Sequence, residues 1–364
     1  MSGNDIKHLV LWQLIFLQLL TVGCKNKEPK FSIKNENHSE DIQDFPALKK
    51  LSDYKKFILP LAGMKPEKDV ILYDLNSSLF SDYAHKKRFI YLPEGASMTY
   101  HPDYAFDFPE GSIVFKFFYF PADFRNPDKN IRIIETRVLI KVEMEWQSLT
   151  YIWNEEQTDA FLTLSGESKS VTWIDESGKT HDITYSVPGM LVCKSCHEFN
   201  SKIAPIGPAA RHLNKPYFAD KEKNQLKVWV ENKKLIGMPE LSTVPRIAQW
   251  GNTKSDINDR SRAYLDINCS HCHRKEGPAK NSGLYLLADE SNNYAYGIKK
   301  TPVAAGRGSG NLKYDIDPGN PEASILVFRM KSLEPGIMMP EAGRRTRHEE
   351  GILLISEWIK KMTI

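Results

Sequence analysis

Two stretches of this 364-residue chain carry the same pattern of cysteine and histidine. Cys193-Lys-Ser-Cys-His197 and Cys269-Ser-His-Cys-His273 both read Cys-x-x-Cys-His, which is the attachment signature of c-type haem. Residues three apart lie on one face of a helical turn, so both thiols can reach the two vinyl groups at one edge of a porphyrin. The histidine that follows can give an imidazole nitrogen to the iron. The pattern predicts two covalently bound haem c groups, with thioether bonds from Cys193, Cys196, Cys269 and Cys272 and iron ligation by His197 and His273.

The alternative chemistry for these cysteines is a zinc site built from two Cys-x-x-Cys pairs, or a redox-active dithiol. Neither alternative explains why a histidine directly follows each pair. Zinc also fits poorly with the export signal described below. The chain has five cysteines, and four of them belong to the two motifs. No thiol pair is left for a structural disulfide, so the fold must depend on its core and its cofactors.

An electron-transfer haem with six ligands needs a second axial ligand, and methionine raises the potential relative to histidine. Met339 precedes Pro340 on a stretch that leads to the last predicted helix. Cytochrome c domains commonly present their methionine ligand at this place. We therefore expect Met339 to ligate the haem at His273, with Met338 as the fallback. The alternative is that both methionines pack in the core.

Several residues could provide the second ligand of the haem at His197. The candidates are Met238, which precedes a proline, then His212 and Met190, and the iron could also keep an open or exchangeable site. Gly207-Pro208 follows His197 at a distance similar to that in class I cytochromes c. In those proteins the proline carbonyl accepts a hydrogen bond from the proximal histidine and fixes its ring.

The N-terminal 24 residues resemble a bacterial lipoprotein signal peptide. Leu9 to Val22 is apolar but too short for a comfortable membrane span, which needs ~20 apolar residues. It is followed by Gly23 and Cys24, and we expect Cys24 to be lipidated after cleavage. The alternative is an ordinary signal or a plain membrane anchor. Lys25 follows the cysteine, which favours the outer membrane by resemblance to lipoprotein sorting in Gram-negative cells. The polar residues 25–45 are then a tether.

Charge is nearly balanced, with 49 Lys and Arg against 46 Asp and Glu, so nothing points to nucleic acid. The basic runs Lys86–Arg88 and Arg344–Arg347 are expected to be solvated, although they could steer an acidic redox partner. His271 occupies the variable position of the second motif, and we also expect it to face solvent.

The elements that position these motifs are predicted from hydrophobic periodicity. We expect an α+β multidomain fold, with a β-rich N-terminal domain followed by a mainly α cytochrome c-like haem region. Its aromatic residues, including Trp146, Trp153 and Trp173, are expected mainly in the core. The predicted strands are 111–120, 131–142, 149–153 and a hairpin of 171–174 with 181–185. The predicted helices are 46–58, 256–266 and 349–360, and the segments 225–230 and 245–250 are expected to be mainly helical or irregular. The predicted domains are 46–190, 191–254 (first haem) and 255–364 (second haem).

Over nearly all of the mature chain, the sequence resembles a bacterial family of diheme c-type cytochromes that is mostly uncharacterised. The more specific stretches are Tyr73–Ala84, Ile134–Leu139 and Tyr151–Ala160, and the haem half adds Pro205–Pro208 and Tyr264–His273. Asp317–Pro321 and Met339-Pro340 complete the resemblance. It implies haem c binding and electron transfer, and it implies no substrate.

The expected function is therefore electron transfer between extracytoplasmic redox partners, by a chain that is lipid-anchored at the outer membrane of a Gram-negative bacterium and faces the periplasm. A haem enzyme with an open site at the first haem, similar to a diheme peroxidase or a dehydrogenase subunit, is the alternative. The long spacing between haem motifs in diheme peroxidases is absent from this sequence. A docking module that brings a dehydrogenase to the haems is compatible with electron transfer.

Overall fold

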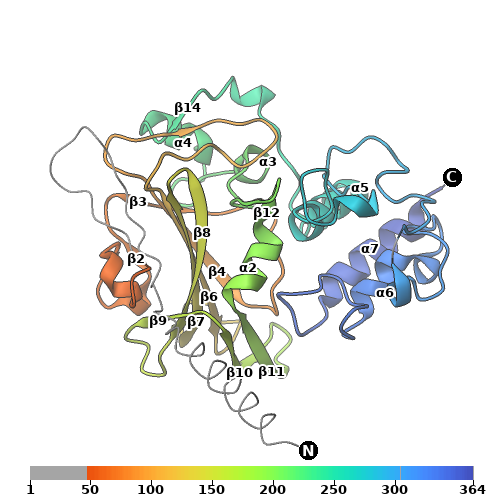
Figure 1. The fold of residues 1–364 in the computed structure, drawn as a ribbon, viewed down its shortest axis with the longest axis horizontal. Coiled ribbons are helices and arrows are strands. Elements are labelled where there is room, and N and C mark those ends of the chain that lie inside the picture. The colour runs from red at the N-terminus through yellow and green to blue at the C-terminus, as the bar shows by residue number, and fades with distance from the viewer. Residues whose placement is uncertain (1–46, 304, 364) are drawn as a thin grey trace, which may run out of the picture. The chain divides into compact units, whose positions relative to one another are not determined.

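The computed structural model describes residues 47–303 and 305–363. The predicted signal peptide, the tether and the lipidation site Cys24 lie outside the described residues. The described part is mixed α and β, with strands concentrated before residue 190 and most of the helices after it (Figure 1). Within the described ranges, no helix is both long enough and apolar enough to span a lipid bilayer.

The centre of the fold is a six-stranded antiparallel sheet with the order β3-β4-β6-β7-β8-β9. Aromatic and β-branched residues dominate its long strands, as expected for a sheet buried on both faces. Of the three strands predicted here, β7 has the predicted bounds, β6 is shifted by one or two residues at its ends, and β8 begins four residues earlier than predicted. The bounds of the six strands are β3 (Val70–Tyr73), β4 (His85–Tyr91), β6 (Ile113–Pro121), β7 (Ile131–Val142), β8 (Glu145–Trp153) and β9 (Ala160–Thr163).

The predicted hairpin is confirmed and is longer than the sequence suggested. β10 (Gly166–Ile174) pairs with β11 (Thr180–Pro188) in antiparallel register. The remaining strand pairs are short, and one of them joins the two halves of the chain: β5 (Met98–Thr99) pairs in parallel with β14 (Leu235–Ile236). The others are β1 (Phe57–Ile58) with β2 (Lys65–Pro66), and β12 (Glu198–Phe199) with β13 (Lys202–Ile203).

The α-helices carry or surround the two Cys-x-x-Cys-His motifs. The predicted helices over 256–266 and 349–360 are confirmed within one residue at each end. Of the two segments expected to be helical or irregular, 225–230 is helical and 245–250 is irregular. The bounds are α2 (Met190–His197), α3 (Ala210–Leu213), α4 (Gln225–Glu231), α5 (Ile257–Leu265), α6 (Ile325–Lys331) and α7 (Glu349–Lys361).

The prediction of a helix over residues 46–58 is wrong. The chain there forms a short 3-10 helix, η1 (Leu51–Tyr54), and then enters β1. The apolar residues are buried as expected, because Tyr54 and Phe57 pack edge-on against Phe115 of the sheet. A stripe of apolar residues therefore covers one face of the sheet, here called the outer face, without an α-helix.

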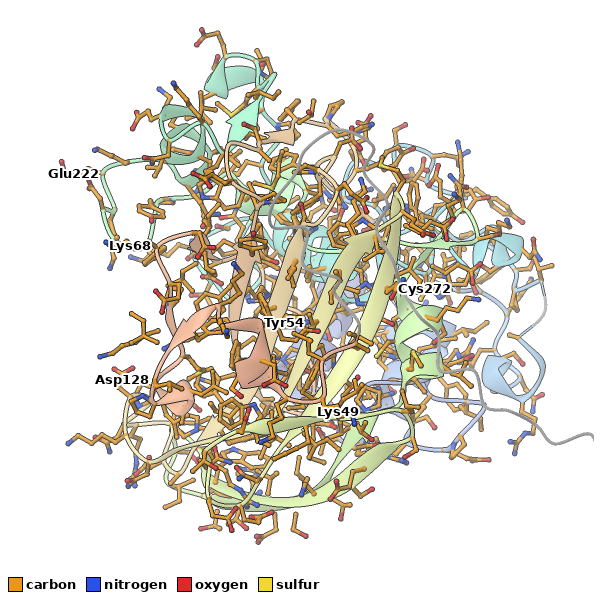
Figure 2. The ribbon with its side chains drawn as sticks, turned by 60° about the vertical axis from the view of Figure 1, so that its left-hand side comes forward. Lys49, Tyr54, Lys68, Asp128, Glu222 and Cys272 are labelled. Carbon is orange, nitrogen blue, oxygen red and sulfur yellow. The ribbon has the colours of Figure 1, made fainter. Side chains whose placement is uncertain are left out.

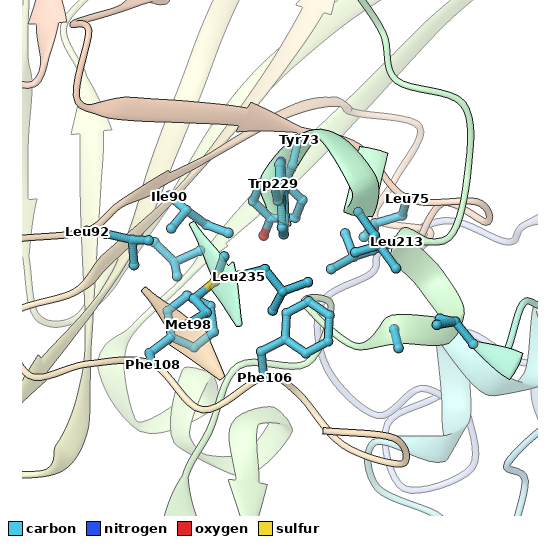
Figure 3. Close-up of a cluster of buried hydrophobic side chains, with 14 of the residues drawn as sticks. Tyr73, Leu75, Ile90, Leu92, Met98, Phe106, Phe108, Leu213, Trp229 and Leu235 are labelled. Atoms are coloured by element: carbon cyan, nitrogen blue, oxygen red, sulfur yellow. The ribbon is translucent and has the colours of Figure 1, made fainter. Parts of the chain in front are cut away.

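The opposite face of the sheet, here called the inner face, is covered in two places. At one end a hydrophobic cluster joins sheet residues such as Ile90 and Leu139 to Leu213 and Trp229 of the helical region (Figure 3). At the other end Phe118 and neighbouring residues pack against the β10–β11 hairpin. The stretch 191–254 thus shares its core with the sheet. Trp153 and Trp173 are buried, as predicted, whereas Trp146 is only partly buried.

One polar contact ties the sheet region to the C-terminal part of the chain. Asp82 is 2% exposed, and its carboxylate accepts hydrogen bonds from the backbone N–H groups of Arg345 and Thr346 at 2.7–2.8 Å. The Thr346 hydroxyl donates to the same carboxylate at 2.8 Å. The loop before α7 is therefore fixed to a residue more than 260 positions earlier.

The C-terminal core forms where α7 crosses α5. Gly351 of α7 meets the side chain of Tyr264 so closely that a Cβ atom at residue 351 would overlap the tyrosine ring and hydroxyl. Tyr264 is 4% exposed and its hydroxyl is 3.0 Å from Nδ1 of His348. The ring therefore cannot move away, and glycine is required for this crossing.

We expect Gly351→Ala to lower the free energy of unfolding by about 1–3 kcal/mol, because overpacking forces the helices apart. Chemical denaturation of the purified protein measures this. Leu353→Ala is the control, since Leu353 lies on the same helix and is 60% exposed. Equal effects of the two substitutions would contradict the close crossing.

Candidate functional site

The first motif occupies the last turns of α2, beside the inner face of the sheet. Cys193 is buried, and its sulfur lies 3.6 Å from Oγ1 of Thr150 on β8. Gly189 caps the helix where the carbonyls of Leu164 and Ser165 leave no room for a Cβ atom. The turn between β9 and β10 therefore sets where the helix begins, and β8 contacts the first thiol.

His197 is held through one ring nitrogen. Its Nδ1 lies 2.8 Å from the carbonyl oxygen of Ala204, to which it donates, and Nε2 is left available to a metal. The expectation that Pro208 would provide this carbonyl is wrong. The Pro208 carbonyl accepts instead from the backbone N–H of Phe106 at 2.9 Å. A backbone acceptor seven residues after the histidine carries no side-chain signal, so the sequence could not identify it.

The second motif follows α5 through a π-helical turn, η4 (Asp266–Ser270). Nδ1 of His273 is 3.4 Å from Oγ of Ser282, and that hydroxyl donates to the Ala279 carbonyl at 2.7 Å. The histidine Nδ1–H is therefore the donor to the serine oxygen, and Nε2 is again free for a metal. Gly277 lies so near the Cys272 carbonyl that a Cβ atom would overlap it. No motif in the sequence pointed to Ser282 or Gly277.

The two motifs meet in the folded chain. The backbone N–H of Asn200, three residues after His197, donates to the carbonyl of Glu276, three residues after His273, at 2.8 Å. The Tyr104 hydroxyl binds the Glu276 carboxylate at 3.2 Å and strengthens this junction. Cys272 lies on the opposite side of the central strands from Tyr54 (Figure 2). Both motifs therefore lie on the inner side of the sheet.

Burial controls the protonation of the motif side chains. It lowers the pKa of His197 to about 4, with the cations Lys116 and Arg137 adding to the shift against the hydrogen bond to Ala204. Burial likewise lowers the pKa of His273 to about 4, with Arg329 adding to it. Both imidazoles are neutral at pH 7, which is the form that binds a metal.

The pKa values of the cysteines in the second motif are strongly shifted in the opposite direction, upward. Burial raises the pKa of Cys269 to about 12, and the nearby Cys272 adds to the shift. Burial also raises the pKa of Cys272 to about 12, and Cys196 of the first motif is the next largest contribution. This electrostatic influence of one motif on the other agrees with their contact.

Two adjoining cavities open on the first motif. The larger, of about 250 Å³, is lined by Cys196 and His197, and the smaller, of about 70 Å³, is lined by Cys193 and His197. Three buried polar atoms on the walls of the larger cavity have no hydrogen-bond partner among the described residues. They are Nδ1 of His212, Nδ1 of His271 and Nη2 of Arg274. Unpartnered buried polar atoms beside free thiols and a neutral imidazole fit a polar cofactor better than a closed core.

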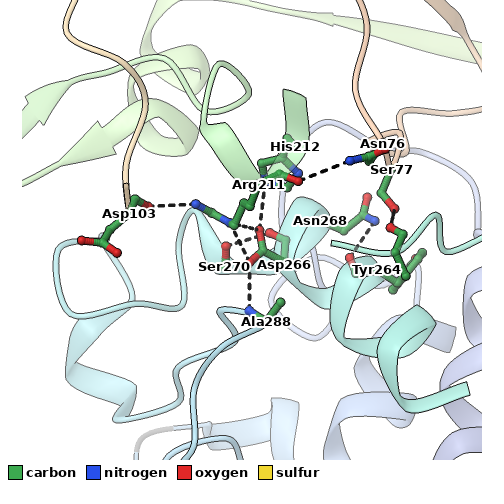
Figure 4. Close-up of polar contacts among 11 residues, drawn as sticks. Asn76, Ser77, Asp103, Arg211, His212, Tyr264, Asp266, Asn268, Ser270 and Ala288 are labelled. Carbon is green, nitrogen blue, oxygen red and sulfur yellow. Dashed lines mark hydrogen bonds and ion pairs between the residues drawn. The ribbon is translucent and has the colours of Figure 1, made fainter. Parts of the chain in front are cut away.

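A buried carboxylate connects the two motif regions. Asp266 is 1% exposed and lies at the start of η4 (Figure 4). Its carboxylate accepts from Nε of Arg211 at 3.0 Å, from Nε2 of His212 at 2.9 Å and from the backbone N–H of Ala288 at 2.9 Å. Arg211 and His212 belong to α3, next to the first motif, and Ala288 follows the second. Asp266 therefore fixes the second motif against the first region.

The candidate second ligands of the first haem lie in different places. His212 lines the larger cavity with His197. Met238 packs at the edge of the cluster around Trp229 and does not line either cavity, and Met190 is 38% exposed at the start of α2. The expectation that His271 faces solvent is wrong. It is half-buried and lines the larger cavity together with Cys196 and His197 of the first motif.

The candidate ligands of the second haem lie on the loop between α6 and α7. Met338 is 8% exposed and Met339 is half-buried. Two arginines brace the loop, because Arg344 donates to the Met339 carbonyl at 2.9 Å and Arg329 donates to the Ile337 carbonyl at 2.8 Å. Both arginines also lie near the second motif, where they affect the pKa values of Cys269 and His273.

The basic runs are not the solvated faces that the sequence suggested. Arg88 and Arg344 are each 5% exposed, and Lys86 is half-buried and donates to the Leu79 carbonyl at 2.9 Å. Only Arg345 and Arg347 of the second run are exposed. In β4 the cause is strand alternation, which turns Lys86 and Arg88 toward the inner face.

Among residues 47–303 and 305–363, no group of three or more His, Cys, Asp or Glu side chains is arranged to hold a metal ion by itself. No family model, no curated protein and no solved structure matches the chain.

Proposed function

We propose that this chain is a diheme c-type cytochrome that carries electrons between redox partners outside the cytoplasm. The observation that supports the proposal most strongly is the contact between the two Cys-x-x-Cys-His motifs, which are far apart in sequence and joined by the Asn200–Glu276 hydrogen bond. Two cofactors attached at adjoining motifs would lie close together. Haem c, when bound, supplies reversible one-electron transfer.

The chain's own residues would do three things for such cofactors. The four motif cysteines would hold the rings, and His197 and His273 would present neutral Nε2 atoms whose orientation the Ala204 carbonyl and Ser282 set. The loop at Met339 would supply the second ligand at the second motif. A cytochrome c-like arrangement of the region after residue 190 is part of this proposal.

We further propose that Cys24 carries a lipid anchor and that the protein lies at the outer membrane, facing the periplasm of a Gram-negative cell. The donor and acceptor would then be extracytoplasmic redox proteins. The support is the sequence of residues 1–25 and the compartment in which c-type haem is attached in bacteria.

One observation favours a second candidate function, a haem enzyme. The cavity of about 250 Å³ beside His197 is lined by His212, His271 and Arg274, each of which has one buried nitrogen without a hydrogen-bond partner among the described residues. If no side chain ligates the far side of the first haem, this cavity could admit a small oxidant such as peroxide. Carbon monoxide or peroxide binding to the first haem would favour the enzyme, whereas two six-coordinate low-spin haems favour electron transfer.

We expect two covalent haems per chain when the full-length protein is made in cells with a working c-type assembly system. Cys193→Ala with Cys196→Ala should leave one, and Cys269→Ala with Cys272→Ala should leave the other, because each pair serves one ring. Mass spectrometry and a haem stain after denaturation count them. Cys24→Ala is the control and should keep both. A chain that carries no haem under these conditions would overturn the proposal.

A further inference from the structure

A row of cationic side chains crosses the middle of the sheet's inner face. Arg88 on β4 is opposite Lys116 on β6, Lys116 is opposite Arg137 on β7, and Arg137 is opposite Thr150 on β8. Directly paired residues of an antiparallel sheet point to the same face. Because Thr150 contacts the Cys193 sulfur at 3.6 Å, the row starts at the first motif and runs away from its thiol.

The row carries more positive charge than its surroundings neutralise. Arg137 pairs with the buried Glu135 at 2.6 Å, and Arg88 lies 3.6 Å from Asp74, which is itself bound to Lys215. Among the described residues, Nη2 of Arg88 has no hydrogen-bond partner and Lys116 makes no ion pair. The Lys116 ammonium group lies 4.7 Å from the centroid of the Phe118 ring.

Keeping Lys116 charged in this buried position costs free energy. Burial lowers the pKa of Lys116 well below its usual range, and repulsion from Arg88 and Arg137 adds to the shift. A buried cation without a counterion destabilises a fold. Side chains of this kind are therefore expected to face an anion that binds there.

The same row lines the smaller cavity together with the first motif. Arg88, Lys116 and Arg137 share this cavity with Cys193 and His197. Neighbouring strands are ~4.8 Å apart, so the Lys116 and Arg88 backbones lie roughly 10 and 14 Å from that of Thr150. The cations thus form part of the cavity wall at increasing distance from the thiol.

We propose that Arg88, Lys116 and Arg137 bind the two carboxylates of the haem attached at Cys193 and Cys196. This inference rests on the proposed function. The carboxylates of haem lie on the edge of the ring opposite the vinyl groups, and the row extends away from the thiol in that direction. Charge-assisted hydrogen bonds to carboxylates are the strong ones, and arginine can make them in pairs. A fixed cation beside the ring also stabilises the reduced haem and so raises its potential.

The test compares Lys116→Met with Lys87→Met in the full-length holoprotein. Lys87 is on the same sheet but points to the outer face, since successive strand residues alternate. We expect Lys116→Met to shift the carboxylate-bending bands of the first haem in resonance Raman spectra. We also expect a tenfold change in its reduction equilibrium toward the oxidised form, which is ~59 mV for one electron. Lys116→Arg should restore both, and Lys87→Met should change neither.

The outcomes of this test distinguish a failure of the carboxylate site from a failure of the proposed function. Suppose that both haems are attached in Lys116→Met and in Arg88→Met, and that neither the carboxylate-bending bands nor the potential changes. That result would overturn the carboxylate site and leave the proposed function intact. A wild-type potential that follows the concentration of added phosphate would assign the row to a free anion instead. A chain without covalent haem would overturn the proposed function, and this inference with it.

Discussion

We expect Asp266→Asn to lower the free energy of unfolding by about 3–5 kcal/mol, the usual cost of removing one partner from a buried ion pair. The substitution leaves Arg211 and His212 without the carboxylate that both contact in a fully buried site. It also weakens the contact between the two motif regions. Denaturant unfolding followed by tryptophan fluorescence measures the loss. Asp259→Asn on α5 is the matched control, since Asp259 is exposed and its effect should stay below about 1 kcal/mol.

The same carboxylate predicts how stability depends on pH. Burial alone would raise the pKa of Asp266, but the Arg211 charge and the His212 hydrogen bond outweigh burial and hold it below its usual value. A lowered folded-state pKa stabilises the fold above the unfolded value of ~3.9, and this contribution is lost as the pH falls below it. The wild type should therefore lose stability below about pH 4 more steeply than Asp266→Asn. Parallel acid profiles would contradict the assignment.

The second large effect is expected at the loop before α7. Met339→Ala should remove the methionine–iron charge-transfer band of one haem, because the sulfur is the proposed second ligand at His273. The potential of that haem should fall by more than ~59 mV, a tenfold change for one electron, since methionine raises the potential relative to histidine. Optical spectra and a redox titration of the holoprotein measure both.

Met330→Ala is the control for this substitution, because Met330 is a buried methionine in the same C-terminal core. It should keep the band even if it lowers stability. Loss of the band in Met338→Ala but not in Met339→Ala would move the ligand by one residue. Retention in both would show that methionine does not ligate the second haem.

Local sequence patterns predicted the long strands and helices well. The contacts between distant segments depend on long-range packing, which these patterns do not show. β7 and α7 follow from clear alternation and helical periodicity, so their bounds agree with the structure closely. The junction of Asn200 with Glu276 depends on how the sheet, α3 and α5 pack together. Neither residue has a side chain that signals the contact. The meeting of the two motifs could therefore not be predicted from their sequence.

The cationic row had a signal in the sequence, but the prediction that Lys86–Arg88 is solvated interpreted that signal wrongly. Lys116 interrupts an otherwise apolar strand, and Lys86 and Arg88 alternate with Lys87 in the next strand. A charge in the middle of a buried strand indicates a counterion or a ligand. Which cations stand side by side depends on the strand register, however, and register is set by the packing of both faces.

The tie between Asp82 and Thr346 has a consequence for the order of folding. The fold cannot be completed until residue 346 is available, because Asp82 would otherwise be a buried carboxylate without donors. Contacts of such long sequence separation form late and slowly. Both Cys-x-x-Cys-His motifs precede Thr346 in the chain, so each emerges before the structure can close over it. The topology thus leaves an interval in which the four thiols are accessible to the haem-attachment enzyme that the proposed function requires.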